Sequence, residues 1–391
     1  MLVITAPGQG AQTPGFLAPW LEFPGVAERI GAWSELIECD LIKYGTAGDA
    51  DEIRDTAVAQ PLLVAAALAA AGVLGVAARV PDGIVAGHSV GELAAGAIGG
   101  IVTSDDAMRL IGVRARAMAK AAAAESTSMT AVLGGQEAEV IATIERHGLT
   151  AANINATGQI VAAGTLAELE AFAEDPPPRA RLRPLKVAGA FHTSHMSSAV
   201  ESLAEVAATV TTRDPVLTVL SNRDGAAVRT GTDWLERIVN QVSTPVRWDK
   251  CMATMRAMRA TAFIELPPAG TLTGLARRAM PSVALLALKT PSDLDAARAL
   301  LAEHASSHSD HHAPEWRLIV AATAGTFRVT ASMSVGAAVN IGTELGQIEA
   351  RGGAKPVAAD FPATVIEWLV EDGDPISQGQ PLVRLQPGSQ D

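Results

Sequence analysis

A single serine stands between two glycines in residues 85–92, VAGHSVGE, directly after an apolar run. The pattern G-x-S-x-G puts a serine hydroxyl on a sharp turn between a strand and a helix, where it can act as a nucleophile. The N-terminus of that helix directs free backbone N–H groups to the same place, where they can bind a developing oxyanion. Ser89 is therefore a candidate nucleophile and the N–H of Val90 a candidate oxyanion donor, with a serine in an ordinary surface turn as the alternative.

A glycine-rich loop, APGQGAQ at residues 6–12, follows the first apolar run of the chain. A phosphate-binding loop of the G-x-x-x-x-G-K type needs a lysine and a Ser or Thr, and both are missing here. The backbone around Gln9 can instead supply a second oxyanion donor, and a plain turn is the alternative.

Arg114 lies inside the apolar stripe of a helix predicted over residues 104–124, with Ser104 as its cap. An arginine that points into a core must be paired, because an unpaired buried charge is very costly. Two partners fit the pattern. One is a core carboxylate in a structural salt bridge, and the other is a carboxylate on the substrate, held by the guanidinium fork.

A nucleophilic serine also needs a general base, and the segment VAGAFHTSHM offers His192 and His195 where a β-like run ends. His88 adjoins Ser89, but neighbouring residues on a sharp bend tend to point apart. A hydrogen-bonded structural role is the alternative for any one histidine. An H-x-x-H metal pair has no further ligands in the sequence, so we expect no metal site.

Composition favours a folded protein of two or three domains that does not bind nucleic acid. The chain has 391 residues, 48% of them hydrophobic, and a net charge of −12 that offers no general basic face to phosphates. Its two cysteines allow no disulfide framework. Residues 62–78 are apolar, alanine-rich and short, which favours a buried helix over a membrane span. The first residues lack the basic start of a secretory signal, so we expect a soluble cytoplasmic protein with no membrane partner.

Four segments are predicted along the chain. Residues 1–303 alternate β-like runs with alanine-rich helical stretches, which indicates an α/β domain with a mostly parallel sheet. Within it, about residues 126–190 read as an inserted ferredoxin-like α+β subdomain. Residues 304–315 form a His/Ser-rich linker containing His304, His308, His311 and His312. Residues 316–391 read as short strands in two similar halves, because Gly336, Val339, Gly342 and Leu345 recur as Gly373, Ile376, Gly379 and Leu382.

Taken together, these residues resemble the malonyl-CoA:acyl carrier protein transacylases of fatty acid and polyketide synthesis. The resemblance covers about residues 1–300 and rests on motifs that occur in the family's order: PGQGAQ, GHSVGE, GVRARAM, NINATGQIVAAG, GAFHTSHM, LSNRDG, TPVRW and ELPPAGTLTGLARR. It implies an α/β-hydrolase-like parallel-sheet core and transfer of a malonyl group from malonyl-CoA to the phosphopantetheine thiol of acyl carrier protein. The intermediate it implies is a malonyl-serine ester.

The resemblance also implies roles for individual residues. Ser89 matches the nucleophile, His192 the base and Arg114 the residue that grips the malonyl carboxylate. The roles below follow in the same way. The oxyanion hole matches the backbone N–H groups of Gln9 and Val90, the substrate-binding set includes Phe191 and His88, and a backbone carbonyl near Arg247 is expected to orient the histidine.

Two other functions remain open at this point. A serine hydrolase or thioesterase acting on acyl-CoA or acyl carrier protein would use a Ser-Asp-His order, with the histidine late in the domain. A non-catalytic scaffold, in which the acyltransferase domain is a relic, is the second alternative. The tail adds weight to it, because the tail resembles biotinyl and lipoyl carrier domains but lacks their acceptor lysine. In that resemblance the tail is a barrel-sandwich in which Gly352 takes the place of the acceptor lysine, with Lys355 off register. We therefore expect no covalently bound cofactor.

Overall fold

The computed structural model describes residues 1–76, 80, 82–306, 317–330, 333–350 and 352–387. The chain divides into two compact units, Met1–Ser307 and His308–Asp391. Most of the expected linker, including His308, His311 and His312, lies outside the described residues. Its expected start at residue 304 is wrong, because helix α13 (Leu294–Ser306) continues through the first three residues assigned to it. Within that helix the ring of His304 is 2.9 Å from the hydroxyl of Thr261.

A five-stranded parallel sheet forms the centre of the larger unit, in the order β10-β9-β1-β2-β7. Its strands are β1 (Leu2–Ala6), β2 (Ile84–Gly87), β7 (Thr218–Leu220), β9 (Ala262–Glu265) and β10 (Ala284–Ala287). The three central strands are buried along their whole length, as expected where helices cover both faces of a parallel sheet. The sequence prediction of an α/β fold with a parallel sheet is confirmed.

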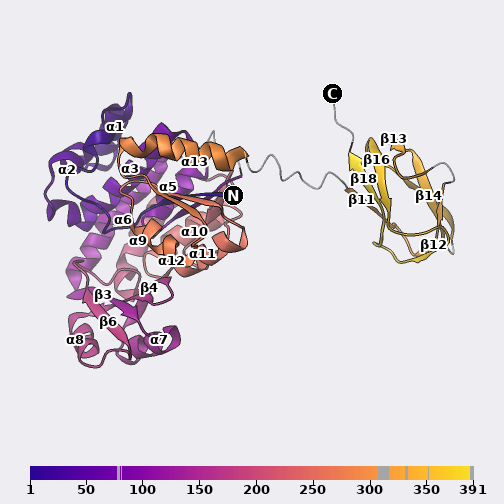
Figure 1. Cartoon of the computed structure of the whole chain (residues 1–391). Coiled ribbons are helices and arrows are strands. Elements are labelled where there is room, and N and C mark those ends of the chain that lie inside the picture. Colours follow the sequence, from indigo (N-terminus) through magenta and orange to yellow (C-terminus); the bar gives the residue numbers. More distant parts are fainter. Residues whose placement is uncertain (77–79, 81, 307–316, 331–332, 351, 388–391) are drawn as a thin grey trace. The chain divides into compact units, whose positions relative to one another are not determined.

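Helices cover the two faces of this sheet unequally (Figure 1). The larger apolar core joins one face, through Leu2 and Ile4 of β1, to a group of helices that includes α2 (Leu41–Ala47) through Leu41. The other members are α1 (Val26–Ile37), α3 (Thr56–Leu74), α5 (Gly91–Ile98), α6 (Ser104–Ala124), α9 (Ser197–Ala207), α10 (Gly231–Gln241) and α13. Val3 packs on the other face against α11 (Trp248–Ala257) and α12 (Thr271–Ala279). The short helix α2 contacts α1 and α3.

Helix α3 carries the most apolar stretch of the chain. By length and composition alone it is the one helix among the described residues that could cross a membrane, yet 78% of its apolar window is buried inside the fold. It starts before the expected run, because the Asp55 side chain caps it, and it ends where Gly75 takes a left-handed conformation. The expected buried helix is therefore present, with Pro61 inside it rather than before it.

Helix α6 brings Arg114 to the core. Its cap is Thr103, whose hydroxyl accepts the N–H of Asp106 at 3.0 Å, and not the expected Ser104, which is the first helical residue. Arg114 is 1% exposed and Arg109, on the opposite face, is exposed, as the apolar stripe predicts.

A second sheet lies at one end of the larger unit (Figure 1) and has the order β6-β3-β5-β4-β8. Its elements follow one another as β3 (Thr127–Gly134), α7 (Glu137–Arg146), β4 (Thr150–Ala156), β5 (Gln159–Thr165), α8 (Leu166–Glu174) and β6 (Ala180–Pro184). This is the β-α-β-β-α-β order of a ferredoxin-like unit. Strand β8 (Val246–Arg247) adds to it in parallel, pairing Arg247 with Ile154 of β4.

The smaller unit consists of two four-stranded antiparallel sheets, β11-β18-β16-β13 and β15-β14-β12-β17. The strands are β11 (Arg317–Val320), β12 (Gly325–Val329), β13 (Ala338–Val339), β14 (Glu344–Ala350), β15 (Gly353–Ala358), β16 (Ala363–Trp368), β17 (Pro375–Ile376) and β18 (Pro381–Pro387). The repeated glycines Gly336, Gly342, Gly373 and Gly379 all have a φ between 82° and 95°. They occupy equivalent turns before β13 and β14 and before β17 and β18, where a side chain would be strained.

Candidate active site

Ser89 stands on the turn between β2 and α5 with a φ of 51°, a left-handed conformation that few residues with a side chain adopt. Its main-chain N–H donates to Oδ1 of Asn222 at 2.7 Å. The turn is tight enough to need both flanking glycines. A Cβ on Gly87 would lie 1.9 Å from the carbonyl carbon of Gly91, and a Cβ on Gly91 would lie 2.3 Å from the carbonyl oxygen of Ala6.

Replacing Gly91 with alanine is expected to lower the free energy of unfolding by about 3 kcal/mol, because the new methyl group has to displace the backbone of β1. Gly72→Ala in helix α3 is the matched control. A Cβ there meets nothing within 4 Å, so this change is expected to raise stability by about 0.5–1 kcal/mol. Urea unfolding curves of the two variants measure the difference, and equal stabilities would contradict the packing described for the turn.

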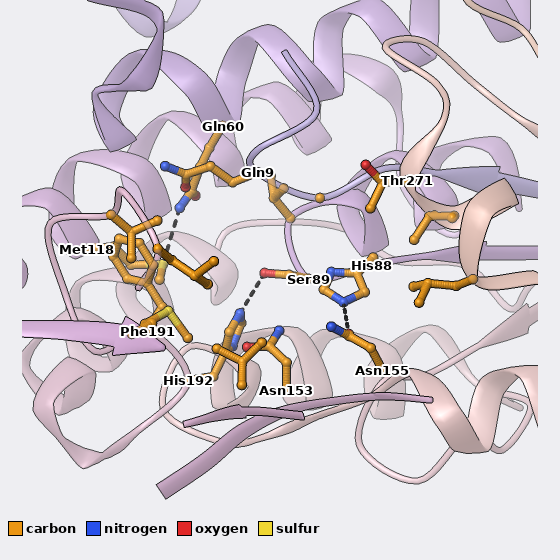
Figure 2. A pocket seen from close by; sticks show the side chains of 18 residues that line it. Gln9, Gln60, His88, Ser89, Met118, Asn153, Asn155, Phe191, His192 and Thr271 are labelled. Carbon is orange, nitrogen blue, oxygen red and sulfur yellow. Dashed lines mark hydrogen bonds between the residues drawn. The ribbon is translucent and has the colours of Figure 1, made fainter. Parts of the chain in front are cut away.

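His192 faces the serine. Its Nε2 is 2.7 Å from Oγ of Ser89, and Figure 2 shows the two side chains pointing toward each other. Its Nδ1 is 2.8 Å from the main-chain carbonyl of Gln241, which can only accept, so the ring proton is on Nδ1 and the lone pair of Nε2 faces the hydroxyl. Burial, together with the nearby charge of Arg114, lowers the pKa of His192 to about 3. The ring is therefore neutral at physiological pH, which is the form that can take a proton.

The expectation that Arg247 supplies the orienting carbonyl is wrong. The acceptor is the carbonyl of Gln241, the last residue of α10, where a helix leaves carbonyls without intrahelical partners. The Arg247 side chain instead pairs with Asp249, at 2.7 Å between Nη2 and Oδ2, and its N–H donates to the carbonyl of Asn222 at 2.8 Å.

Arg114 lies behind the serine. Its Nη1 donates to Oε1 of Gln60 at 2.6 Å, and its Nη2 donates to Oε1 of Gln241 at 2.8 Å and to Oγ of Ser89 at 3.4 Å. Among the described residues no carboxylate forms an ion pair with it, which removes the structural salt bridge as an explanation. Burial, partly offset by the charge of Glu92, lowers the pKa of Arg114 to about 10, so the guanidinium remains a cation at neutral pH.

The other predicted site residues, Gln9, Val90, His88 and Phe191, line a cavity next to Ser89 and His192. The N–H groups of Gln9 and Val90 have no hydrogen-bond partner within the part of the chain that the structure describes. His88 turns away from the serine and its Nε2 is 2.8 Å from Oδ1 of Asn155, so it links the turn to β4 (Figure 2). Phe191 is 6% exposed and lines the cavity.

The cavity itself has a volume of about 170 Å³ and lies between the parallel sheet and the ferredoxin-like layer. Its walls combine an apolar set with polar groups near the serine. Lining residues are Gly8, Gln9, Gln60, His88, Ser89, Val90, Met118, Met129, Asn153, Asn155, Val161, Leu185, Val187, Phe191, His192, Thr271, Leu272 and Leu275. His195, the rival base, lies outside it and pairs with Glu125, at 2.6 Å between Nδ1 and Oε2. No cluster of three or more metal-ligating side chains occurs among the described residues.

Sequence reasoning missed four residues that hold the site together. Gln60 was detectable, because it is the one amide in an otherwise apolar helix, and Glu92 was detectable as the one charge in α5. Asn222 and Gln241 gave no such signal, since each is a polar residue in a polar stretch. All four are buried, and between them they bond Ser89, His192 and Arg114.

Comparisons with known proteins agree with this geometry. The family model described as "Acyl transferase domain" matches residues 7–314. The malonyl CoA-acyl carrier protein transacylase of Mycobacterium tuberculosis H37Rv is 52% identical over 297 residues, which is 75% of this chain and 98% of that protein. The one from Escherichia coli K12 is 31% identical over 298 residues, 74% of this chain and 96% of its own.

Solved structures give the same picture for the larger unit. The crystal structure of MCAT from Mycobacterium tuberculosis superposes with a TM-score of 0.74 at 52% identity, covering 76% of this chain and 99% of that one. A malonyl-transacylase solved in complex with a type II polyketide synthase acyl-carrier protein superposes with a TM-score of 0.71 at 26% identity, covering 76% of this chain and 99% of that one.

Proposed function

Because the chain belongs to the malonyl-CoA:acyl carrier protein transacylase family, we propose that it transfers a malonyl group from malonyl-CoA to the phosphopantetheine thiol of an acyl carrier protein. This acyltransferase serves fatty acid synthesis, or polyketide synthesis where the carrier belongs to that pathway. One observation carries the proposal. A buried guanidinium with no carboxylate partner among the described residues lies 3.4 Å from the hydroxyl of a Ser–His pair.

The transfer takes place in two steps, acylation of Ser89 and deacylation by the carrier thiol. Oγ of Ser89 attacks the thioester carbonyl of malonyl-CoA while Nε2 of His192 takes its proton. The N–H groups of Gln9 and Val90 stabilise the oxyanion. The C–S bond breaks, the departing sulfur receives the proton from His192, and a malonyl ester remains on Ser89. The carrier thiol then attacks that ester, His192 takes the thiol proton, and the proton returns to Ser89 as the thioester leaves.

Arg114 provides selectivity for an acyl group with a free carboxylate. Its guanidinium has five N–H donors, of which the oxygens of Gln60 and Gln241 occupy one each and the Ser89 hydroxyl a third. The remaining donors can hold a carboxylate beside Ser89. The apolar side of the cavity, with Met118 and Phe191, excludes the water that would hydrolyse the ester.

A hydrolase is less well supported than a transferase. The Ser-Asp-His arrangement needs a carboxylate on Nδ1 of the histidine, and that atom is bonded to a main-chain carbonyl. A scaffold without activity does not account for a 2.7 Å contact between serine and base.

The proposal is tested by loading the whole protein with radiolabelled malonyl-CoA. We expect label on the peptide that contains Ser89, and transfer of that label when carrier protein with its phosphopantetheine arm is added. If free malonate is released at the same rate in the presence and in the absence of carrier protein, the hydrolase is favoured instead.

For the smaller unit we propose a barrel-sandwich of the biotinyl and lipoyl type that carries no cofactor. Support comes from the paired glycine turns and from the hairpin that joins β14 and β15. Gly352 occupies that hairpin, whereas Lys355 is within β15, paired with Ile348. Arg351, next to the expected acceptor position, lies outside the described residues. We also propose a cytoplasmic location, which the burial of α3 in the core supports.

A further inference from the structure

Glu92 is a buried acid three residues after the nucleophile, in the first turn of α5, and it is 2% exposed. Within the described chain it forms no ion pair. Its Oε1 accepts the main-chain N–H of Asn222 at 2.8 Å, and its Oε2 accepts an N–H from the Gln241 side chain. A buried carboxylate without a directly bonded cation costs free energy, so its place beside the site needs an explanation.

The side chain of Gln241 connects this acid to the catalytic groups. Its Nε2 donates to Glu92 and to the main-chain carbonyl of Ser89, the latter at 3.0 Å, and its Oε1 accepts from Nη2 of Arg114 at 2.8 Å. If the amide were turned over, its oxygen would face two acceptors and its NH₂ group would face the guanidinium. The charges of Glu92 and Arg114, on opposite sides, therefore fix the orientation of the amide.

We propose that Glu92 is a positioning residue for carboxylate recognition, acting through the side-chain amide of Gln241. The acid holds the amide oxygen toward Arg114, and this contact aims the remaining guanidinium N–H groups at the position of the acyl carboxylate beside Ser89. Glu92 also balances the charge of Arg114 before substrate binds. It does not occupy the N–H groups of the guanidinium, because the Gln241 amide lies between the two charged groups. The inference rests on the proposed function, since it assumes that a substrate carboxylate binds Arg114.

A neutral amide cannot replace the acid in this arrangement. The two donors that face Glu92, from Asn222 and Gln241, need two acceptor oxygens, and glutamine at position 92 offers one oxygen and one NH₂ group. Glu92→Gln therefore leaves one buried N–H opposite another. The Gln241 amide then loses its fixed orientation, and with it the acceptor on Arg114.

The test measures the ratio of kcat/KM for Ser89 acylation by malonyl-CoA to that by acetyl-CoA, at pH 8. Burial raises the pKa of Glu92 to about 7, so the acid is mostly ionised there. Glu92→Gln is expected to lower the ratio about tenfold, the size of a lost hydrogen bond to a charged group. Glu92→Asp, which keeps two acceptor oxygens, is expected to restore part of it. Glu168→Gln is the matched control, because that acid also accepts a main-chain N–H, from Thr165 at 2.8 Å, and neither residue lines the cavity, so the ratio should stay within about twofold of wild type.

A double-mutant comparison separates this role from a general structural one. Gln241→Met removes the amide and keeps the main-chain carbonyl that holds His192, so it should lower the ratio as Glu92→Gln does. The double variant should be no lower than the single Met variant, because Glu92 then has nothing to orient. The proposal is overturned if Glu92→Gln leaves the ratio unchanged, or if the two substitutions lower the ratio independently, so that their effects multiply in the double variant. Either result leaves the proposed function intact as long as the wild type transfers malonyl groups. If Glu92→Gln does not fold, an unchanged ratio in Gln241→Met overturns the proposed role of Glu92. If the wild-type protein does not transfer malonyl groups, the proposed function itself is refuted.

Discussion

Ser89→Ala is expected to abolish malonyl loading, with kcat for transfer falling by at least about 10⁴-fold. In the described part of the chain, the Ser89 hydroxyl bonds the base and no other serine or threonine hydroxyl or cysteine thiol does. The expected loss is in chemistry and not in folding, because Ser89 is held by its main chain, through the N–H bond to Asn222 and the carbonyl bond to Gln241.

Mass spectrometry of the protein after exposure to malonyl-CoA measures the effect directly, since the ester adds the mass of a malonyl group. Ser198→Ala, at an exposed position in α9, is the control and should load as the wild type does. His192→Gln should keep the hydroxyl and lose about 10²–10⁴-fold in loading rate, the contribution of a general base. A Ser89→Ala protein that still gains malonyl mass and passes it to the carrier would place the nucleophile elsewhere.

The main catalytic groups could be predicted from sequence because their chemistry constrains residue type. The turn needs glycines on both sides of Ser89, and the buried cation can be identified because Arg114 interrupts the apolar stripe of its helix. The parallel sheet could be predicted for a similar reason, since strands covered on both faces read as continuous apolar runs such as those of β1 and β9.

The orienting carbonyl could not be predicted in the same way. A main-chain oxygen is present at every residue, so its position depends on where helix α10 ends and not on which residue is there. The sequence pointed to Arg247, whereas the helix ends at Gln241 and leaves its carbonyl toward His192. The end of α13 could not be predicted either. The expected linker begins at residue 304, but no residue near 303 is of a type that ends a helix, and α13 continues to Ser306.

Arg114→Met is expected to lower kcat/KM for malonyl-CoA by about 10²–10³-fold while leaving acetyl-CoA within about tenfold of wild type. Removing one partner of a buried charged contact costs about 2–5 kcal/mol, and only malonyl-CoA presents a carboxylate to the guanidinium. Methionine fills much of the arginine's volume, so it avoids the cavity that Arg114→Ala would open in α6. Both variants should shift preference toward uncharged acyl groups.

Arg114→Lys tests whether charge alone is sufficient. Lysine keeps the cation but not the planar fork, so it cannot serve the oxygens of Gln60 and Gln241 and a substrate carboxylate together. Its malonyl activity should therefore fall between those of wild type and Arg114→Met. The same three proteins measured with malonyl-CoA and acetyl-CoA give the selectivity directly. A malonyl preference that survives in Arg114→Met would mean that another group binds the carboxylate, and the buried cation would then have only a structural role beside Glu92.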